Sequence, residues 1–211
     1  MRKIIFITIL FSLICGNAFS QRKLGESEKA FFEKKIVEQS KKIKTLQCAF
    51  VQEKTSALVA EKAVSKGILM YQTPSMLRWE YAEPTPSTLI LNGNDAVLLD
   101  KNNKKVGNEK MLRQLGGIII SMINGNGIAQ NKQFSTEFYE LQNAQMLVVL
   151  TPVQKRLKDF YSKIELKIDL NTMLANEIIL NEKSGDKTVI LLTNKVLNTE
   201  ISKKRFEIIK K

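Results

Sequence analysis

Hydrophobic positions near the start of the chain recur first at helical spacing and then at every second residue. Residues 27–43 predict an amphipathic helix that Ser27 caps, with Glu28 in its first turn. The apolar face of this helix consists of Phe32, Ile36, Val37, Ser40 and Ile43. From Leu46 the period changes to two, which predicts a half-buried strand over 46–54.

The next part of the chain combines strand patterns with proline breaks. A second strand is predicted over 64–71 and ends before Pro74, because proline cannot donate a ladder hydrogen bond. In the third strand one face is apolar and aromatic, and it consists of Leu77, Trp79 and Tyr81. Two further strands, over 88–91 and 96–100, are joined by a turn at Asn92-Gly93. This order predicts an antiparallel meander.

Helical spacing returns over 108–123, as one helix or as two short ones around Gly116-Gly117, before the strand patterns resume. The apolar positions of this second helical segment are Met111, Leu112, Leu115, Ile118, Ile119 and Met122. The later strands are predicted over 134–141, 146–151, 160–170, 175–181 and 188–194. Nine or ten strands joined mostly by turns favour a large, curved antiparallel sheet over a doubly wound parallel one. Only the concave face of such a sheet is available to cover the second helix.

Residues 1–20 have the pattern of a cleaved signal peptide. Arg2 and Lys3 precede an apolar run over 4–14, and small residues then predict cleavage before Gln21. We expect the mature chain, 21–211, to be one exported, soluble domain of 191 residues in the periplasm. No later segment offers about 18 continuous apolar residues for a transmembrane helix.

The two cysteines have different expected fates. Cys15 lies in the signal segment, and Ile14 precedes it where a lipoprotein signal has a small residue, so the sequence favours removal of Cys15 over lipid anchoring. Cys48 is then the one cysteine of the mature chain and cannot form an intramolecular disulfide. Its alternation with Leu46 and Phe50 predicts a buried thiol.

The chain contains no histidine, which narrows the catalytic alternatives. Ser-His-Asp chemistry and the usual catalytic zinc ligand sets are excluded. A carboxylate pair formed by Glu80 and Glu83 stays open as a weaker alternative, because both flank a strand and no second group converges on them. We expect a protein that is not an enzyme and that has no metal or other cofactor.

The chain is basic, with a formal net charge of +12 that falls to +10 when Arg2 and Lys3 leave with the signal segment. Such a surface suits anionic partners such as lipid headgroups, and it is equally typical of simple solubilising charge. A nucleic-acid partner is disfavoured, because the lysines are scattered and no basic motif contains interleaved aromatic residues.

Several short motifs follow one another in a specific order and spacing, namely Phe50-Val51-Gln52, Gly67-Ile68-Leu69, Pro74, Arg78-Trp79-Glu80-Tyr81 and Pro84. This order resembles the periplasmic outer-membrane lipoprotein carrier family of LolA-like proteins, which commonly has Asp-Gly where this chain has Asn92-Gly93. The resemblance covers nearly the whole mature chain, although the second half matches by layout more than by motif. It implies a mainly β fold with α insertions: an unclosed, curved antiparallel β-barrel, or half-barrel, covered by a helical lid.

The resemblance also implies a function. A member of this family binds the acyl chains of lipoproteins in an apolar cavity, receives them from an inner-membrane, ATP-driven releasing complex and carries them toward the outer membrane, where an acceptor can take them over. We expect a monomer. The residues expected to line the cavity are Phe50, Leu69, Met70, Leu77, Trp79, Tyr81, Leu89, Met111, Leu115, Ile118 and Met122. The methionines in this set have flexible side chains, which can adapt to the irregular shape of bound acyl chains.

One position departs from the family pattern. Many of these carriers place an arginine directly before the motif proline, where it bonds to the lid, whereas this chain has Thr73. Threonine cannot make the charged, multidentate contacts of arginine. The expected lid-gating candidates are therefore Thr73 and Arg78. An alternative function within the same fold also stays open, namely a periplasmic sensor of lipoproteins or a carrier of other envelope lipids.

Overall fold

The computed structural model describes residues 21–59, 61–107, 109–123, 125, 128 and 132–208. The predicted signal peptide lies outside these residues. The strands are β1 (Arg22–Lys23), β2 (Thr45–Thr55), β3 (Lys62–Gln72), β4 (Met76–Glu83), β5 (Ser87–Asn92), β6 (Asp95–Asp100), β7 (Lys105–Val106), β8 (Phe134–Leu141), β9 (Gln145–Pro152), β10 (Tyr161–Asp169), β11 (Leu174–Glu182) and β12 (Lys187–Leu197). The helices are α1 (Glu26–Ser40), α2 (Glu109–Ile123), α3 (Lys155–Lys158) and a 3-10 turn, η1 (Lys203–Phe206).

Across the described residues, all twelve strands belong to one antiparallel sheet, in the order β1-β8-β9-β10-β11-β12-β2-β3-β4-β5-β6-β7. Two meanders, β2 to β7 and β8 to β12, are joined where β12 pairs with β2, as in the pair of Leu192 with Phe50. The two-residue strands β1 and β7 lie at opposite edges, so the sheet stays open. The predicted unclosed, curved antiparallel sheet is confirmed.

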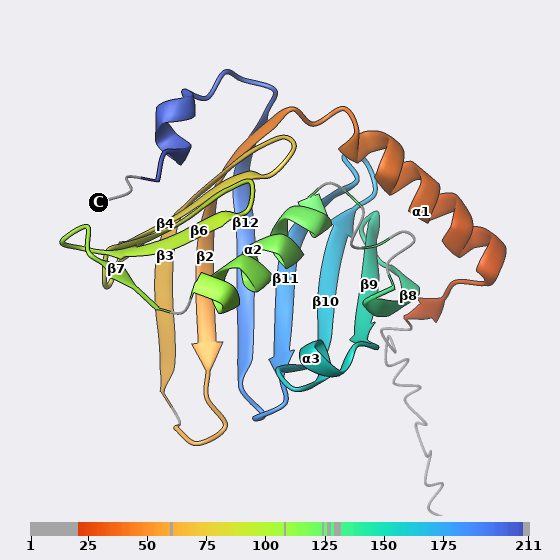
Figure 1. The fold of residues 1–211 in the computed structure, drawn as a ribbon. Coiled ribbons are helices and arrows are strands. Elements are labelled where there is room, and N and C mark those ends of the chain that lie inside the picture. The colour runs from red at the N-terminus through yellow and green to blue at the C-terminus, as the bar shows by residue number, and fades with distance from the viewer. Residues whose placement is uncertain are drawn as a thin grey trace, which may run out of the picture.

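Figure 1 shows how the helices cover this sheet. Helix α2 crosses the concave face in front of β2, β12 and β11, whereas α1 runs beside the β8 to β10 side. The main core lies between α2 and the sheet, because alternate residues of each strand point to that face; on β2 these are Leu46, Cys48 and Phe50. Among the described residues, no helix is both long enough and apolar enough to cross a membrane.

A second, smaller core lies on the outer face of the sheet. Met70 and Ile201 pack there with Phe206 of η1, and Met76 is partly buried against them. Figure 1 shows η1 beyond β4, on the side of the sheet away from α2. The Asn92 side chain donates to the Phe206 carbonyl at 3.3 Å, which helps to hold this C-terminal turn in place.

The helix cap and the shortest elements differ from the sequence-based expectation. Helix α1 begins at Glu26 with Gly25 as its N-cap, so the predicted cap at Ser27 is wrong. The Glu28 carboxylate accepts a hydrogen bond from the Gly25 amide at 3.0 Å and ion-pairs with Arg22 at 2.9 Å, which favours the earlier start. The strands β1 and β7, helix α3 and turn η1 were not predicted, because two to four residues carry too little periodicity.

Candidate functional site

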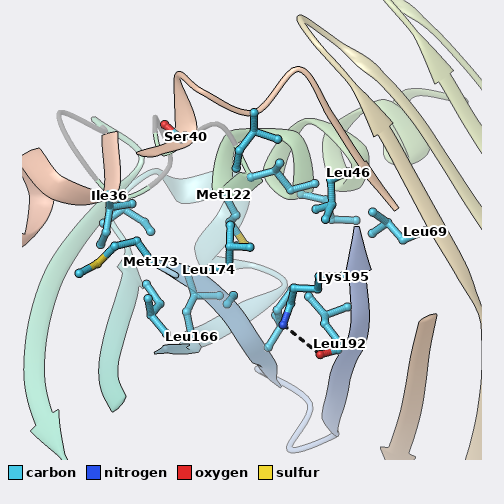
Figure 2. Close-up of a pocket in the computed structure, with 17 residues that line it drawn as sticks. Ile36, Ser40, Leu46, Leu69, Met122, Leu166, Met173, Leu174, Leu192 and Lys195 are labelled. Atoms are coloured by element: carbon cyan, nitrogen blue, oxygen red, sulfur yellow. Dashed lines mark hydrogen bonds between the residues drawn. The ribbon is translucent and has the colours of Figure 1, made fainter. Parts of the chain in front are cut away.

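Two apolar cavities lie between α2 and the concave face of the sheet. The first, of about 50 Å³, is bounded by the end of α1, by α2 and by strands β2, β3 and β10 to β12. Figure 2 shows side chains from these elements pointing into a common space. Its apolar wall includes Ile36, Leu46, Leu69, Met122, Met173 and Leu174.

The second cavity, of about 250 Å³, lies under the same helix toward the other end of the sheet. It is bounded by α2 and by strands β2, β4, β5 and β10 to β12. Its wall is apolar and aromatic and includes Trp79, Tyr81, Leu89, Ile118, Tyr161 and Ile190. The polar side chains at this cavity are Gln52, Lys54 and Thr188.

The two cavities share part of their wall. Ile119 and Met122 from α2 and Ile178 from β11 contact both. The two cavities are therefore neighbours along the concave face, and α2 supplies two of these three shared wall residues.

An aromatic cluster builds the β4 side of the second cavity. The ring centroids of Phe50 and Trp79 lie 5.1 Å apart, as do those of Phe50 and Tyr81. The Tyr81 hydroxyl donates to the Gln52 side-chain oxygen at 3.0 Å, and burial raises the pKa of Tyr81 to about 12, so the phenol is neutral at physiological pH. Trp79 is 3 % exposed, and its Nε1–H has no hydrogen-bond partner among the described residues. The cluster is thus large, rigid and nearly free of charge.

One lysine side chain is part of the wall of each cavity. Lys54, at the second cavity, forms ion pairs with Glu182 at 3.2 Å and Asp186 at 3.5 Å, so its charge is balanced by carboxylates. Lys195, at the first cavity, instead donates to two neutral oxygens, those of the Asn176 side chain at 2.5 Å and the Leu192 carbonyl at 3.1 Å.

The groups considered for catalysis do not meet at either cavity. Cys48 is buried, as predicted, and burial raises the pKa of its thiol to about 11, so the thiol stays protonated and is a poor nucleophile at neutral pH. Glu80 accepts from Arg78 at 2.7 Å, and Glu83 is exposed beside Lys66 at 3.8 Å. Within the described ranges, no group of three or more acidic or cysteine side chains could hold a metal ion.

The structure brings six of the predicted cavity residues to the cavities. Leu69 lines the first, Met122 lines both, and the second is lined by Trp79, Tyr81, Leu89 and Ile118. Phe50 and Leu77 are fully buried in the same core but do not line either cavity. The side chains of Met111 and Leu115, on α2, lie outside the described residues.

The prediction for Met70 is wrong. Met70 follows the inward-facing Leu69 on β3, so it points to the outer face and packs against Phe206. The apolar character of Met70 was a sound signal for burial, but it did not indicate which face buries it.

The two gating candidates also lie away from α2. Thr73 is exposed; its amide donates to the Lys44 carbonyl at 2.9 Å, and its side chain shares a hydrogen bond with Tyr71. Arg78 points to the outer face, where it bonds to Glu80 and donates to the Arg205 carbonyl at 3.2 Å, so it holds the C-terminal turn and not the lid.

Two contacts in the first half of α2 hold this helix to the sheet instead. Arg113 donates to the Asn94 carbonyl at 2.9 Å, in the turn between β5 and β6. Gly116 lies directly against Leu91, since a Cβ at this glycine would fall 2.1 Å from the Leu91 side chain. The first half of α2 is therefore attached to β5 and β6, while the second half carries the side chains that close the cavities.

The sequence matches the family model described as "Outer membrane lipoprotein carrier protein LolA" over residues 41–209. No curated protein matches. Among solved structures, an uncharacterized conserved protein from Thermus thermophilus is similar at a TM-score of 0.52 and 10% identity, covering 86% of this chain and 94% of that one. The MucA/MucB complex structure from Pseudomonas aeruginosa gives a TM-score of 0.50 at 10% identity, covering 86% and 61%.

A LolA superfamily protein from Nitrosomonas europaea is similar at a TM-score of 0.45 and 12% identity, covering 83% of this chain and 97% of that one. At these identities the solved structures are similar in fold alone. The family model, however, matches most of the chain, from the end of α1 through every strand from β2 to β12. The chain therefore belongs to the LolA family of outer membrane lipoprotein carrier proteins.

Proposed function

We propose that this chain is a periplasmic carrier that takes acylated lipoproteins from the inner to the outer membrane, with their acyl chains held between α2 and the sheet. The observation that supports the proposal best is the pair of apolar cavities under one helix, which share Ile119, Met122 and Ile178 as wall residues. Each methylene of an acyl chain gains about 0.8 kcal/mol on leaving water. An apolar container therefore suffices, and we propose no catalysis and no cofactor.

The volumes bear on how such a carrier would be loaded. Cavities of about 50 and 250 Å³ fall below the roughly 300–1,000 Å³ typical of small-molecule sites, so an acyl chain would need more room than either cavity offers alone. Loading would displace the second half of α2 and join the two spaces. Because α2 is attached to β5 and β6 near its start, we propose that it opens about that attachment.

The proposal includes the partners and the compartment. An inner-membrane, ATP-driven releasing complex would supply the lipoproteins, and an outer-membrane acceptor would receive them where one exists. The mature chain, 21–211, would act as a single-domain monomer after removal of a signal peptide. A second candidate is a sensor, or a carrier of other envelope lipids, because the apolar walls would accept acyl chains from any source.

The single tryptophan of the chain gives a direct test of acyl binding. Trp79 lines the second cavity, so a fatty acid brominated near the middle of its chain is expected to quench the tryptophan fluorescence saturably, and the unbrominated acid to compete. Bromide ion, which stays in water, is the control and is expected to leave this buried ring unquenched. Folded protein that shows no saturable quenching would rule out acyl chains in this cavity.

A further inference from the structure

Lys195 reaches the first cavity because of an irregularity in β12. The pairing of β12 with β2 is regular up to Thr193 and resumes at Val196, so the two residues between them are not paired with β2. Asn194, the first of these, has a φ of +52°. A bulge of this kind changes the direction of the next side chain. Figure 2 shows Lys195 beside Leu192 with its nitrogen bonded to the Leu192 carbonyl, and Lys195 is part of the wall of the first cavity.

The Lys195 side chain is half-buried beside the mostly apolar wall of the first cavity. The other polar residue of the first cavity wall, Ser40, already donates from its hydroxyl to the Val37 carbonyl at 2.8 Å. Within the described part of the chain, Lys195 has no carboxylate within ion-pair distance. Burial lowers the pKa of Lys195, and the smaller opposing effects of Cys48 and Asp169 do not offset it. A buried charge is costly unless it is fully bonded.

The donors of Lys195 are only partly used. An ammonium has three N–H donors, and two of them meet the Asn176 and Leu192 oxygens. Both acceptors belong to the strands β11 and β12 that form the floor of the cavity. The third donor and the remaining charge are thus available to an acceptor inside the cavity.

We infer that Lys195 binds the carbonyl or carboxylate oxygen at the polar end of an acyl chain held in the first cavity. The inference rests on the proposed function, and it adds an orientation: the polar end lies at Lys195, and the hydrocarbon runs under Met122 and Ile119 into the second cavity. The ester and amide carbonyls of a lipoprotein anchor and the carboxylate of a free fatty acid provide the same acceptor chemistry.

The test compares three ligands of equal chain length, each brominated at mid-chain: a fatty acid, its methyl ester and the alkane. The variant Lys195→Met keeps most of the side-chain length and removes the charge. Measured by quenching of Trp79, Lys195→Met is expected to bind the acid at least tenfold more weakly than the wild type and the ester about threefold more weakly, and to bind the alkane equally well. Lys187→Met, which removes an exposed lysine of the same strand, is the control and is expected to bind all three ligands as the wild type does.

The possible outcomes distinguish a failure of the Lys195 site from a failure of the proposed carrier function. Weakening of the acid alone supports the site and assigns it to a carboxylate, whereas weakening of both acid and ester assigns it to the carbonyl group in general. If Lys195→Met binds each of the three ligands as tightly as the wild type does, the inference is overturned and the proposed function still stands. Equal weakening of all three ligands would also overturn it, since the effect would then be one of packing. A wild type that binds none of the three would overturn the proposed function itself.

Discussion

Replacing Gly67 by alanine is expected to lower the free energy of unfolding by about 3 kcal/mol, and with it the melting temperature by about 6–12 °C. A Cβ at Gly67 would fall 1.9 Å from the Glu80 carbonyl oxygen and 2.8 Å from two ring atoms of Phe50. The backbone of β4 cannot move aside without breaking its pairing with β3, and Phe50 is held by Trp79 and Tyr81.

Thermal and urea unfolding would measure the effect of Gly67→Ala. The matched control is Gly117→Ala on α2, where a Cβ would have no atom within 4 Å. Alanine is favoured over glycine in a helix, so this variant is expected to be more stable than wild type by about 0.5–1 kcal/mol. If Gly67→Ala unfolds at the wild-type temperature, the close packing of Phe50 over β3 is not a feature of the native protein.

The second large effect is expected for Ile119→Glu. Ile119 lines both cavities from the lid, so a carboxylate there would have to be desolvated against the acyl chain. We expect acyl binding to weaken by about tenfold to a hundredfold. Fluorescence quenching with the brominated fatty acid would give both affinities.

A charged residue elsewhere on the same helix serves as the control. Gly117→Glu places the same carboxylate two residues away, at an exposed position with open space around it. The affinity of this variant for the brominated fatty acid is expected to stay close to that of the wild type. Circular dichroism would establish that both variants are folded. Wild-type affinity in folded Ile119→Glu would show that acyl chains do not pass beneath this part of α2.

The strand pattern could be predicted well because it depends on local alternation. The period of two at Leu46, Cys48 and Phe50 reflects one buried face, and the observed strands agree with the predicted ones within about two residues at most ends. The pairing of β12 with β2 could not be predicted in this way, because it joins segments more than a hundred residues apart and no local feature specifies it.

The candidate site was harder to predict than the fold. Leu69 and Met70 are neighbours of similar hydrophobicity, yet they are buried in different cores, since the strand turns one to each face. Lys195 gave no signal in the sequence, because its inward direction depends on a bulge that the alternation of β12 does not reveal. Ile119 and Ile178 line both cavities because of how α2 packs on the sheet, and the hydrophobic pattern of the sequence does not specify that packing.

Release of lipoproteins from inner membranes tests the central claim most directly. The mature chain, 21–211, would be incubated with spheroplasts or lipoprotein-loaded membranes, and the supernatant analysed for lipoproteins bound to it. We predict that the wild type releases them in a soluble one-to-one complex, and that folded Ile119→Glu releases few or none. If folded wild-type protein, active in acyl binding, leaves every lipoprotein in the membrane, the carrier function proposed for this chain is wrong.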